Sequence, residues 1–406
     1  MPDIFSSELP VWLNKSFFEK VLRTSSGDKN LTIADFSVAA SANTGEQYAS
    51  TIFKATVKYA NKFQSDAVTK LFVKLVVPKV NAFSDENSFD TELNMYINTL
   101  PDMQRLLSMT EKKVELAPRL LYSVKEPVPV LVFEDATTNG YGLSSGPLNF
   151  EGTKFVATKL AKFHAASVYL NHDGKGVQYY QNGLFNLKSR DGVNFMKNNM
   201  SLFVDEIKTW EGFDMITEKV TKLIDKFEAS GNQIYQTNAA GEGFNVLNHG
   251  DFHINNMVFK KDSEGKLSDV LFLDFQLSKW GSPTIDLFYL LYLVASQEAR
   301  ENHRDEIILH YHQALVKALK DIGYMTKPPT LLDLNVQLLK NGFMEVVIAI
   351  CFLPFLNLDP HTQDVEVAFE NGVEGVNLRK TLYRHPKYKE MISKLISDFL
   401  YKGHLN

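Results

Sequence analysis

Two stretches decide the fold: His249-Gly-Asp-Phe-His-Ile-Asn-Asn-Met257 and, shortly after it, Leu271-Phe-Leu-Asp-Phe-Gln276. The first places a carboxylate, Asp251, five residues before an amide, Asn256. The second ends an apolar run at Asp274, and such a run predicts a buried strand from which the carboxylate projects. A polar turn at 260–266 separates two short strand patterns, so a β-hairpin is expected between the stretches.

This spacing favours phosphoryl-transfer chemistry. One carboxylate must orient the attacking hydroxyl and accept its proton, while a neutral oxygen ligand and a second carboxylate hold Mg²⁺ against the triphosphate. Asp251 has the position of the base, and Asn256 and Asp274 have the positions of the two Mg²⁺ ligands. Each piece alone is ordinary, because His-Gly-Asp is a common turn and an Asp after a strand often caps a helix. The joint spacing predicts a catalytic site, with His253 interpreted as a plain loop residue.

A lysine in the N-terminal third supplies a matching group. Lys74 lies inside the otherwise apolar strand pattern Leu71–Val77, where an ammonium is costly unless it is paired. Glu92, on the following helical pattern, is a suitable partner. A strand lysine that bridges to a helix glutamate and touches the α- and β-phosphates of ATP is the kinase arrangement. The alternative is an edge-strand lysine whose head reaches solvent.

Three further positions are weaker candidates for nucleotide binding. Gly45 and Ser50 belong to a turn at 41–50, between two strand patterns, that would present backbone N–H groups to phosphates. With a single glycine, an ordinary hairpin turn explains this segment nearly as well. Glu134 lies in the stretch Val130–Asp135, whose backbone would suit an adenine ring, and a core strand explains its apolar run equally well.

The remaining pattern predicts an α+β protein with a small β-rich N-terminal lobe, residues 1–135, and a larger helical lobe, residues 136–406. We expect an opening helix from Pro10 to Leu22 and a later one at Ser88–Thr99. Strand patterns of the first lobe lie at Leu31–Ala40, Ile52–Tyr59, Leu71–Pro78, Pro118–Val124 and Val128–Glu134. Long helical patterns of the second lie at Phe150–Tyr169, Met196–Glu228, Gln297–Gly323, Leu331–Phe355 and Lys387–Tyr401.

Composition narrows the classes of partner. The chain has 406 residues and a net charge of −5, which does not suit a nucleic-acid-binding surface. The longest apolar run, Val346–Phe355, is half the length that a membrane-spanning helix needs. Cys351 is the single cysteine, so no intramolecular disulfide forms, which fits a reducing cytosol. We therefore expect a cytoplasmic monomer that binds neither nucleic acid nor membrane.

The whole pattern resembles the ecdysteroid kinase-like family, within the aminoglycoside and choline kinase-like phosphotransferases. The resembling segments are Gly45-Glu-Gln-Tyr-Ala-Ser50, Leu131–Asp135, Leu160-Ala-Lys-Phe-His-Ala165, Val246–Phe259 and Asp269–Tyr292. The resemblance implies a protein-kinase-like bilobal fold that uses ATP and Mg²⁺. It assigns Asp251, Asn256, Asp274, Lys74 and Glu92 the roles given above.

The resemblance also extends to supporting residues. By it, His249 is a structural loop histidine and Asp286 braces the catalytic loop, although Asp286 also suits the cap of a helix at Ile285–Ala295. His164 matches a position that is more often packing than chemistry. Two departures stand out: many relatives have Trp where this chain has His253, and the phosphate-binding turn is poor in glycine.

The expected reaction is transfer of the ATP γ-phosphoryl group to a hydroxyl of a small molecule. By resemblance the acceptor is an ecdysteroid, or a plant or xenobiotic alcohol or glycoside. Two alternatives stay open: a nucleotide- or steroid-binding protein without catalysis, and a choline or aminoglycoside-type kinase, whose cationic acceptor would need an acidic or aromatic pocket. The aromatic residues Phe185, Phe203, Trp210 and Phe213 suit either an apolar acceptor pocket or the core.

Overall fold

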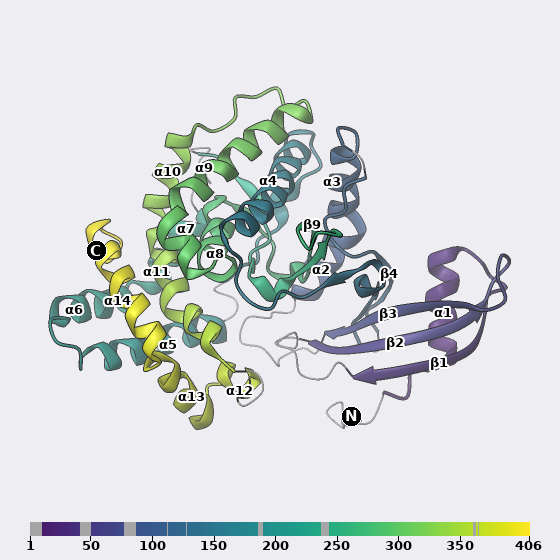
Figure 1. Ribbon diagram of the computed structural model, residues 1–406, viewed down its shortest axis with the longest axis horizontal. Helices are drawn as coiled ribbons and strands as arrows, with labels where there is room; N and C mark the ends of the chain where they lie inside the picture. Colours follow the sequence, from purple (N-terminus) through teal and green to yellow (C-terminus); the bar gives the residue numbers. More distant parts are fainter. Residues whose placement is uncertain are drawn as a thin grey trace.

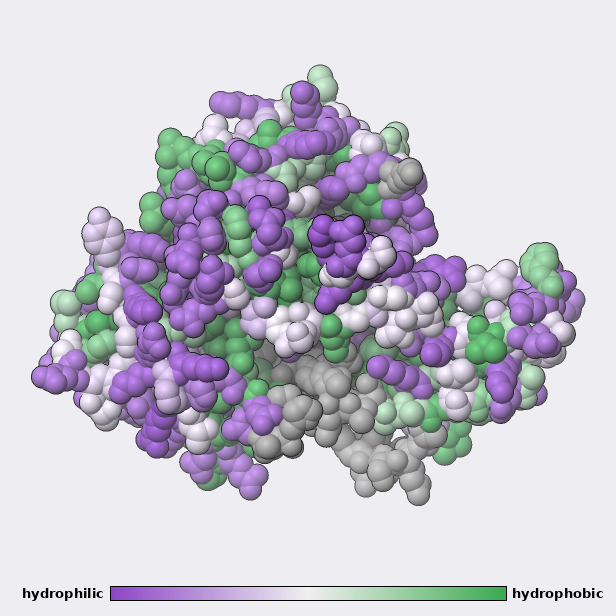
Figure 2. Space-filling model, in the orientation of Figure 1, coloured by the Kyte–Doolittle hydropathy of each residue, from purple (hydrophilic) through white to green (hydrophobic). Residues whose placement is uncertain are grey.

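The computed structural model describes residues 10–40, 50–76, 87–111, 113–126, 128–185, 190–236, 243–359, 363 and 365–406. Long strands come early in the chain and helices dominate after them, which confirms the predicted α+β class with a small β-rich part and a larger helical part. In Figure 1 the long strands and helix α1 (Lys15–Ser26) project to one side of the helical body. Figure 2 shows that polar side chains cover most of this face, and that the outline is indented where the sheet leaves the helical body.

The N-terminal part is built on a five-stranded antiparallel sheet in the order β1-β2-β3-β5-β4. Its strands are β1 (Thr32–Ala40), β2 (Ser50–Ala60), β3 (Ala67–Val76), β4 (Leu120–Val124) and β5 (Val130–Glu134). Alternating apolar residues of β2 and β3 pack against α1 in a core of their own. The helix begins at Lys15, because the Asn14 side chain accepts a hydrogen bond from the Phe17 N–H at 3.1 Å. The predicted start at Pro10 is therefore wrong by about one turn.

The helix predicted at Ser88–Thr99 runs further than expected. Helix α2 (Ser88–Asn94) continues through a π-helical turn, Met95–Thr99, into α3 (Leu100–Leu107). Pro101, which has no N–H to donate, lies in the first turn of α3 directly after the π-helical turn, and it does not stop the helix. The apolar face of this helix belongs to the large core of the C-terminal part. The domain division at residues 135 and 136 stays a prediction.

Two small sheets carry the loops of the candidate site. One has the order β6-β8-β9, from β6 (Tyr141–Gly142), β8 (Met257–Lys261) and β9 (Leu267–Phe272). The other pairs β10 (Lys279–Gly281) with β7 (Val246–Asn248). The β8–β9 pair is the predicted hairpin, with Met257 opposite Phe272. This register brings Asn256 beside Leu273, whose N–H donates to the Asn256 carbonyl at 2.9 Å.

Helices form the rest of the C-terminal part. Within the described chain they are α4 (Phe150–His172), α5 (Arg190–Ile207), α6 (Asp214–Asp225), α7 (Phe227–Gln236), α8 (Thr284–Tyr289), α9 (Gln297–Asp321), α10 (Leu331–Lys340), α11 (Gly342–Cys351), α12 (Val365–Phe369), α13 (Val373–Tyr383) and α14 (Pro386–Tyr401). Helices α4 and α9 pack along one another at the centre.

Two predicted helices are wrong as single elements. The pattern Met196–Glu228 divides into α5, α6 and the start of α7, and Gly212, with φ of 81°, lies in the turn between α5 and α6. The pattern Leu331–Phe355 divides at Asn341 into α10 and α11. A side chain on Gly342 would overlap the His404 ring. The glycine at the start of α11 therefore lets the C-terminal residues pack closely against this helix.

The aromatic residues considered for an acceptor pocket pack in the core. Phe203 lies edge-on to Trp210, which in turn lies edge-on to Phe213. Phe185 is buried against Phe227. Cys351 is also fully buried, as expected of a small hydrophobic side chain.

Within the part of the chain that the structure describes, no single helix has the length and hydropathy to cross a membrane. The bent pair Leu331–Lys340 and Gly342–Asn357, with 58° between its members, is the one combination that reaches both limits together.

Candidate active site

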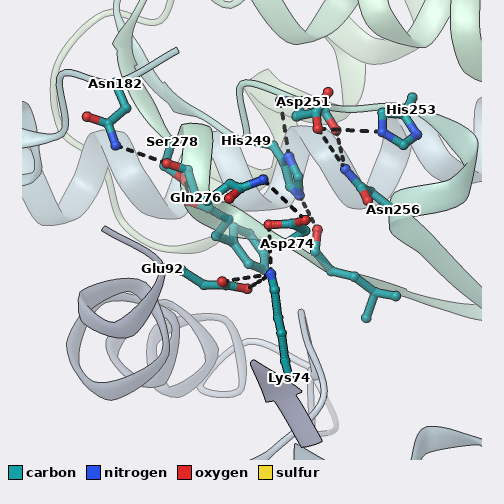
Figure 3. A network of polar contacts seen from close by, with 12 residues as sticks. Lys74, Glu92, Asn182, His249, Asp251, His253, Asn256, Asp274, Gln276 and Ser278 are labelled. Carbon is teal, nitrogen blue, oxygen red and sulfur yellow. Dashed lines mark hydrogen bonds and ion pairs between the residues drawn. The ribbon is translucent and has the colours of Figure 1, made fainter. Parts of the chain in front are cut away.

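The strand lysine and the helix glutamate meet the carboxylate from the second decisive stretch. Lys74, near the end of β3, places its Nζ 2.9 and 2.8 Å from the two Glu92 carboxylate oxygens. The same Nζ lies 3.0 Å from Asp274 Oδ1, which is 200 residues away in sequence (Figure 3). The three charges predicted from separate patterns therefore form one cluster between the sheet and the helical part.

The charges of this cluster compensate one another. Lys74 and Glu92 are almost completely buried, with 6% and 1% of their surface exposed. Burial alone would lower the pKa of Lys74, but the Asp274 and Glu92 carboxylates outweigh it and raise the pKa above its ordinary value. Lys74 is therefore a fixed cation at neutral pH, aimed at the place where Asp274 projects.

The backbone at Asp274 turns sharply. With φ of 61° it is the one non-glycine residue in the described chain that has a positive φ. Such a conformation costs of order 1–3 kcal/mol and is maintained by its surroundings. One support is His249, whose Nε2 lies 2.7 Å from the Leu273 carbonyl oxygen. Burial lowers the pKa of His249, so the ring is neutral and donates through Nε2 while Nδ1 accepts the Asp251 N–H at 3.3 Å.

Asp251 and Asn256 close the first decisive stretch into one unit. The Asn256 Nδ2 donates to the Asp251 carbonyl at 2.9 Å and to the Asp251 Oδ2 at 3.1 Å. These bonds fix the amide so that its Oδ1 is the atom left to accept a cation. The imidazole Nε2 of His253 lies 3.5 Å from Asp251 Oδ2. His253 is thus more than the plain loop residue expected, since its imidazole lies beside the carboxylate of the candidate base.

The electrostatics keep the candidate base ionised. Burial would raise the pKa of Asp251, but the neighbouring His253 and the hydrogen bond from Asn256 outweigh burial, and the pKa falls below its ordinary value. Burial would likewise lower the pKa of His253, but Asp251 reverses this shift and raises the pKa. Asp251 is therefore a carboxylate at neutral pH and accepts a hydrogen bond from a hydroxyl placed beside it.

Asp286 braces the loop that carries the base. Its fully buried carboxylate accepts the His249 N–H at 2.7 Å and the Gly250 N–H at 3.0 Å. His164, expected to be packing, also contributes: its Nε2 lies 3.1 Å from Asp286 Oδ2 and its Nδ1 2.7 Å from the Tyr311 hydroxyl. The carboxylate thus joins α8 and α4 to the loop.

Gly250 is required by a close approach of two backbones. Its φ is +86°, and a Cβ there would overlap the Leu277 carbonyl oxygen. The loop that carries Asp251 and the segment that follows Asp274 are therefore packed without room for a side chain between them.

A cavity of about 260 Å³ opens beside the cluster. Its walls come from β2, β3, β5, α2 and the hairpin, and include Ile52, Phe72, Lys74, Glu92, Tyr96, Phe133, Glu134, Asn256, Leu273 and Asp274. Apolar walls with a charged end suit a nucleotide whose base enters first and whose phosphates face Lys74. Lys74, Glu92, Glu134, Asn256 and Asp274 thus all line one cavity.

The other nucleotide-binding predictions have different outcomes. The Glu134 N–H donates to the Arg119 carbonyl at 3.0 Å, so an adenine contact by Glu134 would have to use its carbonyl oxygen. Ser50 begins β2 opposite Val76, and its side chain lies outside the described part of the chain. Gly45 lies outside the described residues altogether.

The oxygen ligands fit Mg²⁺ held together with a nucleotide. Asn256 and Asp274 offer an amide and a carboxylate oxygen, which are ligands that Mg²⁺ accepts. Among the described residues no group of three or more histidine, cysteine or acidic side chains is arranged to hold a metal by itself. A site of this kind is completed by substrate phosphates, since Mg²⁺ is usually bound by one or two protein groups in nucleotide sites.

Sequence reasoning missed two residues that shape the site. Tyr96 stands edge-on to Phe275 at 5.6 Å and lines the cavity. Asn182 donates to Thr91 Oγ1 at 2.8 Å and to the Gln276 carbonyl at 3.0 Å, which ties α2 to the segment after Asp274 (Figure 3). Tyr96 falls within the helical pattern predicted at Ser88–Thr99, which places it on the apolar face with Phe89 and Leu93, whereas no local signal marks Asn182.

Together, the strand lysine, its glutamate and the two decisive stretches define a kinase-like class of small-molecule phosphotransferase. The match to the ecdysteroid kinase-like family covers residues 44–324, and the chain belongs to this family. No curated protein matches the sequence.

Solved structures show a looser likeness. Plasmodium vivax ethanolamine kinase is 13% identical, with 88% of this chain and 83% of that chain covered and a TM-score of 0.38. The GDP and kanamycin complex of APH(2")-IIia is 15% identical, with 94% and 97% covered and a TM-score of 0.39. A choline/ethanolamine kinase family protein from Mesorhizobium loti is 14% identical, with 83% and 88% covered and a TM-score of 0.33. The assignment to the family rests on the sequence match and not on these likenesses.

Proposed function

We propose that the protein transfers the γ-phosphoryl group of ATP to a hydroxyl of a small molecule. The observation that carries the proposal is the convergence of Lys74, Glu92, Asn256 and Asp274 on one cavity, with Asp251 bound directly to Asn256. A bond forms between the acceptor oxygen and the γ-phosphorus, the bond from that phosphorus to the β,γ-bridging oxygen breaks, and ADP leaves. The acceptor proton passes to Asp251.

Each residue has one task in this reaction. Lys74, held by Glu92, neutralises the α- and β-phosphates, and Asp251 orients the attacking hydroxyl. Asn256 and Asp274 would hold Mg²⁺, which supplies compensation for the negative charge on the phosphate oxygens. Asp286 and His249 position the loop rather than contact the substrate.

Membership in the ecdysteroid kinase-like family supports an ecdysteroid, or a plant or xenobiotic alcohol or glycoside, as the acceptor. The complete set of charged groups argues against a protein that binds nucleotide without catalysis. Nothing in the described site favours that alternative, since both metal-binding oxygens and the candidate base are present together.

Asp251→Asn tests the proposal, because it retains the shape of the side chain and removes the base. The acceptor is found first by mass spectrometry, as a species heavier by one phosphate after incubation of a metabolite extract with Mg²⁺ and ATP. We expect kcat to fall by about 10²–10⁴-fold, the usual contribution of a general base, while ATP affinity changes little. Asp305→Asn is the matched control, because that side chain is 98% exposed. Normal turnover by Asp251→Asn, or no phosphorylated product from any alcohol, would count against the proposal.

A further inference from the structure

A second cavity, with a volume of about 760 Å³, adjoins the candidate nucleotide cavity. Tyr96 and Glu134 are among the residues that line both cavities, so the two share a wall. Among the described residues, Lys74 and Asp274 line the nucleotide cavity and not the second one. A ligand in the second cavity would therefore lie outside the site of phosphoryl transfer.

The walls of this second cavity that carry cations come from three separate parts of the chain: α3, the segment 113–119 and the β8–β9 hairpin. The Leu116 N–H donates to the Gln104 side-chain oxygen of α3 at 2.7 Å, and the Leu116 carbonyl accepts the Phe272 N–H of β9 at 2.9 Å. Helix α3, β4 and β9 lie near one another where the sheet joins the helical body (Figure 1). Because these bonds fix the walls to one another, the cavity is formed before a ligand arrives, which reduces the ordering cost of binding.

The lining of the second cavity has more cations than anions. Its positively charged residues come from all three of these parts: Arg105, Lys113, Arg119 and Lys260. Its negatively charged residues are Glu115 and Glu134. The lining thus has an excess of two positive charges, although the whole chain has a net charge of −5. The fold therefore gathers cations here against the charge of the chain as a whole.

Three of these cations are paired with carboxylates at the surface. The partners are Asp102 for Arg105 at 2.5 Å, Glu115 for Lys113 at 2.5 Å and Glu134 for Arg119 at 3.3 Å. All three cationic side chains are mostly exposed, and exposed pairs of this kind contribute little to stability because water screens them. These cations can therefore turn toward an incoming anion at small cost.

Lys260 differs from them, because it has no carboxylate partner among the residues that the structure describes. Its Nζ lies 5.7 Å from the centre of the Tyr141 ring, and Tyr141 lines the same cavity. The Tyr141 hydroxyl donates to Asp269 Oδ2 at 2.7 Å, so this hydroxyl is already used. The Lys260 ammonium group is thus available to an anion in the cavity.

We infer that the second cavity binds a small phosphate monoester with an apolar body. A phosphate monoester carries about two negative charges at neutral pH, which matches the positive excess of the lining. A guanidinium group binds two phosphate oxygens at once, and Arg105 and Arg119 supply two such groups. The apolar body would contact the uncharged part of the lining, which includes Leu100, Val114, Leu120 and Leu271. The inference goes beyond the proposed function and does not depend on it.

Two simpler anions fit the cavity less well. Inorganic phosphate would match the charge but leave the apolar walls in contact with water. A monocarboxylate with an apolar body would cover these walls but leave one positive charge of the excess unmatched.

Isothermal calorimetry with benzyl phosphate tests the inference on the full-length protein. Mg²⁺ and a saturating non-hydrolysable ATP analogue are present throughout, so that the nucleotide cavity is filled. We expect benzyl phosphate to bind at least about tenfold more tightly than inorganic phosphate, because its ring is buried, and more tightly than phenylacetate, because its charge is higher.

A double variant removes cations from two of the walls. Arg105→Gln combined with Lys260→Gln should weaken benzyl phosphate by at least about tenfold and leave the affinity for the ATP analogue unchanged. Lys266→Gln is the matched control, because this exposed lysine belongs to the same hairpin turn and pairs with Glu264 outside the cavity. It should bind benzyl phosphate as the wild type does.

Four results would overturn the inference. Benzyl phosphate binding that disappears when the analogue is added would place this ligand in the nucleotide cavity. Wild-type affinity in a double variant that circular dichroism shows to be folded would exclude the two cations, and equal affinity for inorganic and benzyl phosphate would exclude the apolar walls. An absence of benzyl phosphate binding at millimolar concentrations would remove the site altogether. None of these results bears on phosphoryl transfer, because the variants leave Lys74, Asp251 and Asp274 in place.

Discussion

Replacing Lys74 by Met would leave Glu92 as a buried carboxylate without a cation. The Glu92 side chain is 2% exposed, and both of its oxygens lie within 3 Å of the lysine. Breaking a buried pair by removing one partner costs about 3–5 kcal/mol, because Glu92, whose pKa burial already raises to about 7, must then stay charged without a partner or take up a proton. Asp274 also loses a contact, but its side chain is 23% exposed, so hydration limits the added cost to about 0–1 kcal/mol. We therefore expect Lys74→Met to lower the free energy of unfolding by about 3–5 kcal/mol.

A double variant separates this structural cost from the role in nucleotide binding. Lys74→Met combined with Glu92→Leu replaces the pair by apolar side chains, which is often neutral for stability. Urea unfolding followed by circular dichroism should show the double variant recovering at least about 2 kcal/mol relative to Lys74→Met, while its affinity for Mg²⁺-ATP stays lost. The reasoning is refuted if Lys74→Met costs less than about 1 kcal/mol, or if the effects of the two single variants simply add.

Three further predictions concern residues that support the site or the core. Gly250→Ala should lower kcat by about 10²-fold in steady-state assays, because the added methyl group displaces the loop and misplaces the base. Asp286→Asn should cost about 1–3 kcal/mol in urea unfolding, because the two backbone N–H groups bond to different carboxylate oxygens and the amide replaces one of these oxygens by an NH₂ group, which cannot accept. Burial would raise the pKa of Glu345, but His404 and Arg304 outweigh it and bring the pKa to about 2. A lowered carboxylate pKa stabilises the fold above the unfolded-state value, so roughly 3 kcal/mol should be lost as the pH falls from about 4.5 to about 2, and acid unfolding should show this.

Each of these predictions has a contrary result. Gly250→Ala with normal kinetics would mean that the two backbones separate without harm to the site. Unchanged stability of Asp286→Asn would remove the carboxylate from its role as a brace. Glu345→Gln should flatten the acid-dependent loss of stability, and an unchanged acid transition would place the responsible group elsewhere.

From the sequence we could predict two kinds of site residue. Some have a partner close by in the chain, and others need a partner because burying an unpaired charge is energetically costly. Asp251 and Asn256 could be paired because five residues of one loop separate them. Lys74 could be nominated because an ammonium in an apolar strand needs a carboxylate, although its contact with Asp274 spans 200 residues. The left-handed backbone at Asp274 gave no local signal, because it is imposed by the hairpin and by His249.

Other features of the structure could not be predicted from the sequence, because tertiary packing determines them. The helical periodicity of Met196–Glu228 continues across Gly212, and only the packing of α5 against α6 shows that the chain turns there. Lys279 sits in an unremarkable polar position after a strand, and its burial depends on Gln181 and Tyr235, which come from distant elements. Nothing local distinguishes such a lysine from one in solvent.

The contact between Gly250 and Leu277 has a mechanical consequence. Because no space separates these backbones, the segments that carry Asp251, Asn256 and Asp274 would move together as one rigid unit. The Asp286 carboxylate connects this unit to the helices through its hydrogen bond to Gly250. Lys74 belongs to the sheet instead, and its 3.0 Å bond to Asp274 crosses the gap between the two bodies. Any movement of the sheet relative to the helices would therefore lengthen the bonds from Lys74 to Asp274 and Glu92, so the distance from Lys74 Nζ to Asp274 Oδ1 reports how far the two parts have separated.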